Sequence, residues 1–340
     1  MEVRSHLRSI LFTLLCISLV APLSVFSHRS LGSNPCDRKT LPDPQSLRFD
    51  QLTVLINGYS ESRIPLLHSI AATYAASSLV SSILVLWGNP STSSQTLAEL
   101  SRNLSILYSA GASITVHPQK SSSLNSRFLP RPSIKTRAVL ICDDDIEVDP
   151  KSVDFAFRVW QSNPDRLVGF FARSHDLDLP RKTWIYTVHP DKYSIILTKF
   201  MILKNERLYS YSCGGGGSWE RMRNVVEEMR NCEDILMNFV VADATGEGPT
   251  MVAAERVRDW GDPRNEGGER GEETKAGLSS VNRGGGEHRK RRGDCIREFH
   301  RILGRMPLRY SYGKVVNSVG EQGMCEKGGK LVLCDHQPLN

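Results

Sequence analysis

The stretch Arg137-Ala-Val-Leu-Ile-Cys142, followed at once by Asp143-Asp144-Asp145, decides the fold of this sequence. An unbroken apolar run of this length, rich in branched side chains, is typical of a strand that is buried on both faces. The three carboxylates end the run, and a helix is expected from Pro150 to Gln161 with Asp149 as its cap. A buried strand that leads through polar residues into a helix is the repeating unit of an α/β sheet.

Strands and helices alternate on either side of this stretch. Before it, strands are expected at Leu52–Ile56, Ser82–Trp87 and Ser113–Val116, and helices at Ile64–Ala76 and Thr96–Leu107. After it the pattern is more mixed, with strands near Leu167–Ala172 and Ser194–Thr198 and helices at Ser218–Met229, Glu233–Val240 and Cys295–Leu303. The sequence therefore predicts an α/β fold, with a Rossmann-like mixed sheet flanked by helices. Such sheets bind ligands beyond the carboxyl ends of their strands, where Asn57, Asn89 and Asp143 stand.

Residues Gly261–Gly293 are expected to form a loop, because they hold many glycines and charges and almost no apolar residues. The end of this segment carries the basic run Arg289–Arg292, which supplies much of the formal net charge of +6 over 340 residues. That charge is mild and local, so no nucleic-acid partner is predicted. The run is typical of a solvated loop or an import signal, and it would also suit a diphosphate, which arginine binds through two donors.

The first residues predict a membrane segment. Arg4 and Arg8 precede an apolar run from Ile10 to Phe26, long enough as a helix, at about 1.5 Å per residue, for a thin bilayer. A signal anchor is expected, with a cleaved signal peptide as the alternative, and both place the rest of the chain in the lumen. The expected organisation is a cytosolic tail (1–9), an anchor (10–27), a stem (28–48), a catalytic domain (49–312) and a C-terminal tail (313–340).

The cysteines suit an oxidising compartment. One of the eight, Cys16, lies in the apolar run, and the other seven are Cys36, Cys142, Cys213, Cys232, Cys295, Cys325 and Cys334. None stand as Cys-x-x-Cys, which argues against a zinc ribbon or a redox motif. One or more disulfides are expected, and the odd number leaves at least one thiol without a partner in the chain.

The acidic cluster Asp143–Asp145 is the strongest chemical signal. Three neighbouring carboxylates repel one another, and their hard oxygen atoms suit Mn²⁺ or Mg²⁺. An acidic loop that caps the next helix is the structural alternative. A calcium-binding EF-hand is excluded by Val148 in the position that needs glycine, and an aspartyl phosphatase is disfavoured because three strands precede the cluster. Glu233-Asp234 is a second acidic pair, either stabilising the start of its helix or acting as a catalytic base or charge-stabilising carboxylate.

Five segments occur in the same order as in glycosyltransferase family 64. They are Asn57-Gly-Tyr-Ser60, Val85-Leu-Trp-Gly-Asn89, Leu140-Ile-Cys-Asp-Asp-Asp145, Asn231-Cys-Glu-Asp234 with Met237-Asn-Phe239, and Gly304-Arg-Met-Pro-Leu308. The sequence therefore resembles, over residues 49–312, the C-terminal catalytic domain of the animal exostosins and exostosin-like N-acetylhexosaminyltransferases.

This resemblance implies a GT-A nucleotide-diphospho-sugar transferase fold, a Mn²⁺ (or Mg²⁺) cofactor and retention of the anomeric configuration. It also implies roles for residues of this chain: metal binding by Asp145 and Asp143; donor binding by Asn57, Arg63, Asn89, Arg127, Asp143 and Asp144; catalysis by Asp234, Arg292 and Glu233; and a disulfide between Cys232 and Cys295.

A single catalytic domain after one anchor is similar to the short plant members of the family. Ser60–Arg63 and the Gly261–Arg292 insertion resemble members that transfer mannose from GDP-mannose to glycosyl inositol phosphorylceramide sphingolipids. The expected protein is then a single-pass type II enzyme of the Golgi membrane with a nucleotide-sugar donor and a membrane lipid or glycan acceptor. Two alternatives stay open: a UDP-N-acetylhexosamine-dependent transferase acting on a lipid or cell-wall glycan, and a non-catalytic membrane-anchored binding or adhesion protein on the same fold.

Overall fold

The computed structural model describes residues 34–106, 111–214, 216–262, 285–317, 322–327 and 330–335. The expected anchor at residues 10–27 lies outside these ranges. Within them, none of the helices combines the length and the apolar character needed to cross a bilayer. The elements below belong to the unit that runs from Pro35 to Asn340.

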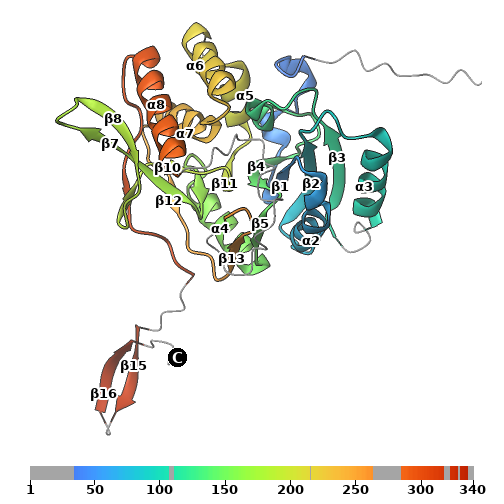
Figure 1. Cartoon of the computed structure of the whole chain (residues 1–340). Coiled ribbons are helices and arrows are strands. Elements are labelled where there is room, and N and C mark those ends of the chain that lie inside the picture. Colours follow the sequence, from blue (N-terminus) through green and yellow to red (C-terminus); the bar gives the residue numbers. More distant parts are fainter. Residues whose placement is uncertain are drawn as a thin grey trace, which may run out of the picture. The chain divides into compact units, whose positions relative to one another are not determined.

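A seven-stranded mixed sheet forms the centre of this unit (Figure 1). Its strands, in spatial order, are β12 (Thr250–Met251), β6 (Val168–Gly169), β11 (Phe200–Lys204), β4 (Thr136–Asp143), β1 (Arg48–Gly58), β2 (Val80–Trp87) and β3 (Ser113–Pro118). Strands β4, β1, β2 and β3 are parallel, whereas β11 runs antiparallel to both β4 and β6. The predicted α/β class with a parallel-rich mixed sheet is confirmed.

Helices cover both faces of the sheet (Figure 1). One face carries α2 (Ile64–Ala75), α3 (Ser94–Ile106) and α4 (Pro150–Ser162), and the other carries α5 (Glu206–Cys213), α6 (Gly216–Met229), α7 (Glu233–Thr245) and α8 (Gly285–Leu303). Successive side chains of a strand point to opposite faces. On β4, accordingly, Leu140 packs in the core on the face covered by α2, α3 and α4. Val139 and Ile141 pack in the core on the opposite face, covered by α5 to α8. The continuous apolar run of β4 therefore reflects burial on both sides.

Shorter elements surround this frame. They are β5 (Ile146–Val148) paired with β13 (Val257–Asp259); a small sheet of β7 (Ala172–Asp178), β8 (Thr183–Thr187) and β10 (Ile195–Ile196); β9 (Lys192–Tyr193) paired with β14 (Ser311–Tyr312); the hairpin of β15 (Gln322–Lys327) and β16 (Lys330–Asp335); and the 3₁₀ turns η1 (Arg38–Thr40), η2 (Pro44–Ser46), η3 (Glu61–Arg63) and η5 (Leu124–Phe128). Most hold too few residues for a period to be read from the sequence.

The prediction of a loop over Gly261–Gly293 is wrong for the last part of this segment, because residues 285–293 belong to α8. The polar composition was misleading, since two residues of this part are buried against the body of the protein. Arg292 forms a buried ion pair with Asp234. At Gly293 the helix runs close to β8, where an added Cβ would lie 3.6 Å from the backbone nitrogen of Tyr186.

Two disulfides join distant parts of the described chain. Cys232–Cys295 links the start of α7 to α8, which confirms the pairing implied by the family resemblance. Cys36–Cys213, which the sequence did not predict, links the expected stem to the end of α5 across 177 positions. Cys142, at the end of β4, is a free and buried thiol.

The Cys36–Cys213 disulfide is expected to stabilise the fold. It closes a very long loop, so replacing both cysteines by serine should lower the free energy of unfolding by about 2–4 kcal/mol, mainly through the entropy of the unfolded chain. Urea unfolding of the full-length protein in detergent, followed by tryptophan fluorescence, measures this. An unchanged unfolding midpoint, in preparations whose thiol titration shows the wild-type disulfides to be formed, would contradict the expectation.

Candidate active site

The carboxyl ends of β1 and β4 form the floor of the site. Asn57 pairs in register with Asp143, and its side-chain Nδ2 donates to the carbonyl oxygen of Cys142 at 2.9 Å. The Asp144 nitrogen donates in return to the Asn57 carbonyl oxygen at 3.2 Å. At the end of β2, Asn89 accepts from the Ser91 nitrogen at 3.0 Å through Oδ1 and so shapes the following turn. Both asparagines thus fix the backbone at the carboxyl ends of strands, where sheets of this kind bind their ligands.

One arginine compensates two carboxylates of the acidic cluster. Arg63, from η3 after β1, places its NH1 atom 3.1 Å from Asp144 Oδ1 and 3.0 Å from Asp145 Oδ2. Asp144 also accepts from the backbone nitrogen of Tyr59 at 3.3 Å. The side chain of Asp145 lies partly open to solvent, whereas Asp144 is buried.

The cluster carries more negative charge than its neighbours compensate. Burial, reinforced by the charge of Asp145, raises the pKa of Asp144 to about 6 against the opposing effect of Arg63. Burial likewise raises the pKa of Asp143 to about 7, although Arg127 opposes this. The pKa of Asp145 is raised as well, chiefly by burial. Such shifts mean that added positive charge would be favourable here.

Arg127 connects the acidic cluster to the start of α7. Its NH1 atom lies 3.2 Å from Asp143 Oδ1, 3.2 Å from Glu233 Oε1 and 2.8 Å from Thr198 Oγ1. Thr198 in turn donates to Glu233 Oε1 at 3.3 Å. Burial raises the pKa of Glu233, while Arg127 opposes the rise. The sequence singled out Arg127 and Glu233, but no pattern around Thr198 indicated its place between them.

Another buried ion pair, between Arg292 and Asp234, lies next to the contacts of Arg127 and Glu233. Arg292 donates from NH2 to Asp234 Oδ2 at 2.6 Å and from NH1 to Asn231 Oδ1 at 3.0 Å. Its guanidinium carbon lies 4.6 Å from the centre of the Tyr186 ring. Burial alone would lower the pKa of Arg292, but the attraction of Asp234 outweighs it and the pKa is raised. No pattern in the sequence indicated that Tyr186, on β8, would contact this arginine.

The local fold of α7 presents Glu233 and Asp234 together. The residue before them, Cys232, has a left-handed backbone (φ 78°) and is held by its disulfide to α8. Farther along the helix, Asn238 accepts from the Ile196 nitrogen and donates to the Ile196 oxygen, both at 2.9 Å. This double hydrogen bond fixes α7 to β10 and explains the asparagine of the Met237-Asn-Phe239 segment.

The segment after β13 lies against Asp145. The Trp260 nitrogen donates to the Asp145 carbonyl oxygen at 2.9 Å. A Cβ on Gly261 would lie 2.2 Å from Asp145 Oδ2, so any side chain there would displace the carboxylate. Lys199 forms an ion pair with Asp259 beside them. These contacts were missed because a glycine inside a polar segment gives no sign of close packing.

The acidic cluster fits a hard divalent cation. Among the described residues, no three His, Cys, Asp or Glu side chains converge as a self-contained metal site. Fewer protein ligands suffice for Mg²⁺-like ions, which take one or two carboxylates and complete their shell with substrate phosphates and water. Asp143 and Asp145 could supply these carboxylates, because both have raised pKa values and keep part of their surface exposed.

The structure therefore gathers most of the predicted site residues. Ion pairs join Arg63 with Asp144 and Asp145, and Arg127 with Asp143 and Glu233. Next to Glu233 on α7, Asp234 pairs with Arg292 of α8. Asn57 joins them through the backbone of Asp144, whereas the hydrogen bond of Asn89 is to Ser91, within its own turn.

Comparison with known proteins identifies the family. Residues 52–320 match the profile described as "Glycosyl transferase family 64 domain". The chain is 61% identical over 328 residues to Glycosyltransferase family protein 64 C3 of Arabidopsis thaliana, covering 96% of this chain and 98% of that one. It is 31% identical over 280 residues to Glycosylinositol phosphorylceramide mannosyl transferase 1 of Arabidopsis thaliana, covering 78% and 76%.

Two other matches are more distant. The chain is 35% identical over 205 residues to Exostosin-1 of Papio anubis, covering 56% of this chain and 24% of that protein. A crystal structure of GalNAc-T7 with UDP, GalNAc and Mn²⁺ resembles it with a TM-score of 0.39 and 10% identity over 57% of this chain and 40% of that one, too distant to inform the fold. On the family profile and the plant relatives, the chain belongs to glycosyltransferase family 64 and is a glycosyltransferase.

Proposed function

We propose that this glycosyltransferase has a GT-A fold and moves mannose, with retention, from GDP-mannose to a glycosyl inositol phosphorylceramide. The observation that carries the chemistry is the chain of buried contacts from Asp143 through Arg127 and Glu233 to the Asp234–Arg292 pair. It sets residues suited to a leaving diphosphate beside a carboxylate suited to the sugar. The similarity to Glycosylinositol phosphorylceramide mannosyl transferase 1 supports the choice of a mannose donor and of this acceptor.

In this proposal the leaving nucleotide is held by groups that are already in position. Asp143 and Asp145 bind Mn²⁺, or Mg²⁺, which when bound would offset the charge that develops on the diphosphate. Asn57, Arg63, Asn89, Arg127 and Asp144 line the nucleotide. Because Arg63 and Arg127 are already fixed by carboxylates, little reorganisation is needed as the sugar bond breaks.

Asp234 and Arg292 act at the sugar. A retaining reaction on one face of the sugar needs a negative group near the positively charged carbon and a firm hold on the leaving group. Asp234 stabilises that charge or orients the acceptor hydroxyl, while Glu233 is kept in place by Arg127 and Thr198. Arg292 fixes Asp234 and is itself fixed by Asn231, so the pair is organised in advance.

We also propose a Golgi location, with residues 10–27 as a signal anchor and the catalytic domain in the lumen. The two disulfides support an oxidising compartment. A catalytic domain that is tethered to the membrane would meet a lipid acceptor at a raised effective concentration.

The donor is tested by calorimetry on the full-length protein in detergent with Mn²⁺. GDP-mannose and GDP are expected to bind at least tenfold more tightly than UDP-N-acetylglucosamine and UDP. Asp145→Asn, which keeps the shape of the side chain but removes its charge, should weaken GDP binding at least tenfold by removing a metal ligand. Preference for the uridine nucleotides would favour the hexosaminyltransferase, and no nucleotide binding by folded protein would favour a non-catalytic binding role.

The pH dependence of the same binding follows from the acidic cluster. With pKa values of about 7 for Asp143 and about 6 for Asp144, protons compete with the cation as the pH falls. Binding of Mn²⁺ and GDP should weaken between pH 7.5 and 5.5, up to about tenfold per pH unit for each competing proton. In the metal-free protein the sign is opposite: these raised pKa values favour the fold near pH 4, and this contribution is lost as the pH rises to 7. Affinity that stays constant from pH 5.5 to 7.5 would contradict the first expectation.

Asp234 is expected to affect transfer more than donor binding. Asp234→Asn should lower the rate of mannose transfer at least 100-fold, because a charge that acts in the transition state is lost, while GDP affinity changes little. The matched control is Asp243→Asn, a carboxylate on the same helix that pairs with Arg305 at the surface. Equal losses in the two variants, or a loss of nucleotide binding alone, would remove Asp234 from the catalytic role.

A further inference from the structure

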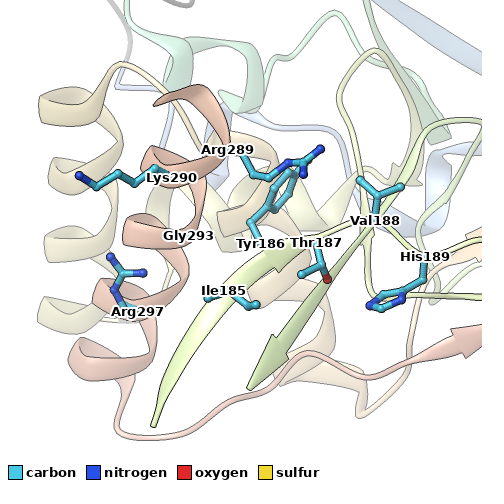
Figure 2. A pocket seen from close by; sticks show the side chains of 9 residues that line it. All are labelled: Ile185, Tyr186, Thr187, Val188, His189, Arg289, Lys290, Gly293 and Arg297. Carbon is cyan, nitrogen blue, oxygen red and sulfur yellow. The ribbon is translucent and has the colours of Figure 1, made fainter. Parts of the chain in front are cut away.

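A groove with basic residues runs between β8 and the first turns of α8. It is lined by Ile185, Tyr186, Thr187, Val188, His189, Arg289, Lys290, Gly293 and Arg297, and has a volume of about 600 Å³ (Figure 2). This lies within the range of roughly 300–1,000 Å³ that is usual for small-molecule sites. Gly293 of α8 faces β8 in this groove, where an added Cβ would lie 3.6 Å from the backbone nitrogen of Tyr186.

Two of the four basic side chains on this groove are already paired. His189 contacts Asp176, and Arg297 contacts Asp294 and the Trp184 carbonyl oxygen. Arg289 and Lys290 have no ion pair or hydrogen bond within the described parts of the chain. Figure 2 shows Arg289 extending toward the side of Tyr186 and Thr187, whereas Lys290 extends to the other side of the helix. The groove therefore holds uncompensated positive charge.

The groove adjoins the candidate active site. Tyr186 is shared, since it lines the groove and its ring lies under Arg292, 4.6 Å from the guanidinium carbon. The basic run is thus divided: Arg292 is buried against Asp234, while Arg289 and Lys290 remain at the surface. The acidic cluster suits the metal and the diphosphate of the donor, and Arg292 is occupied by Asp234, so an anion in the groove would come from the other substrate.

We propose that this groove is a phosphate-binding subsite for the acceptor, with Arg289 as its ligand and Lys290, at the next position of α8, adding positive charge nearby. The inference rests on the proposed transferase function and adds to it the place where the phosphate of the acceptor binds. The ligand is a phosphorylated sugar or polyol, free or as the headgroup of a lipid. An arginine fork matches phosphate oxygens, and a lysine adds a mobile positive charge. Bound there, the phosphate would set the acceptor hydroxyl toward Asp234.

The test measures binding to the full-length protein in a non-ionic detergent with Mg²⁺ and GDP. The probes are inositol 1-phosphate, uncharged myo-inositol and soluble dihexanoyl phosphatidylinositol, titrated by calorimetry at low salt. The variant is Arg289→Gln with Lys290→Gln, which keeps helix-forming side chains. The control is Arg102→Gln with Lys151→Gln, which removes the same charge from exposed positions of α3 and α4 on the other face of the sheet.

Inositol 1-phosphate is expected to bind the wild type and the control variant with equal affinity. Its affinity for the Arg289/Lys290 variant should be at least tenfold lower, and its affinity for the wild type should fall as the salt concentration rises. Myo-inositol should not bind measurably. Tighter binding of the phosphatidylinositol would identify a lipid headgroup as the source of the phosphate, and equal binding would show that the phosphorylated headgroup is recognised without the lipid. The proposal is overturned if the two double variants bind inositol 1-phosphate equally, or if the phosphate gives no advantage over myo-inositol. Loss of GDP binding by the wild type would instead count against the proposed function.

Discussion

The compensation of buried negative charge is the constraint on which this structure depends. Five carboxylates gather where the parallel strands end: Asp143, Asp144, Asp145, Glu233 and Asp234. Three arginines face them: Arg63, Arg127 and Arg292. When all are ionised, two negative charges are left over, which is the charge of one divalent cation. The raised pKa values of the three aspartates express this imbalance. Removing one partner from such a buried set is costly, so each arginine holds the fold as well as the site.

The topology brings these charges together from distant parts of the chain. Arg63 follows β1, the aspartates follow β4, and α7 and α8 supply the second pair. The Cys232–Cys295 disulfide and the double hydrogen bond of Asn238 hold α7 where its first two side chains meet Arg127 and Arg292. The rigid sheet therefore positions the acidic cluster, and a covalently fixed helix pair positions Asp234 and Arg292 beside it.

The parts that could be predicted from the sequence are those with a strong local pattern. The apolar runs of β1, β2 and β4 gave the sheet, because strands buried on both faces are almost continuously apolar. The acidic cluster was visible because three adjacent carboxylates are rare without a charge partner. The Cys232–Cys295 pairing came only from the resemblance, since spacing alone left several pairings open.

The parts that could not be predicted depend on tertiary contact. Tyr186 and Thr198 are ordinary residues of short segments, and their roles arise from Arg292 and Arg127 meeting them. The first turns of α8 are almost wholly polar, yet they are helical because Arg292 is buried against α7 and Cys295 is fixed by its disulfide. Tertiary packing outweighs weak local preference in such a segment.

The same helix connects the two sides of the proposed reaction. Inward, α8 presents Arg292 to Asp234; outward, one turn earlier, it presents Arg289 to the groove behind Tyr186. Because Cys295 and the buried Phe299 fix the helix to the core, its two surfaces cannot move independently. A ligand that draws α8 toward β8 would therefore also shift the guanidinium that holds Asp234. In the proposed reaction, acceptor binding and the organisation of Asp234 and Arg292 would thus be coupled through one helix, which would favour charge separation at the sugar only when both substrates are in place.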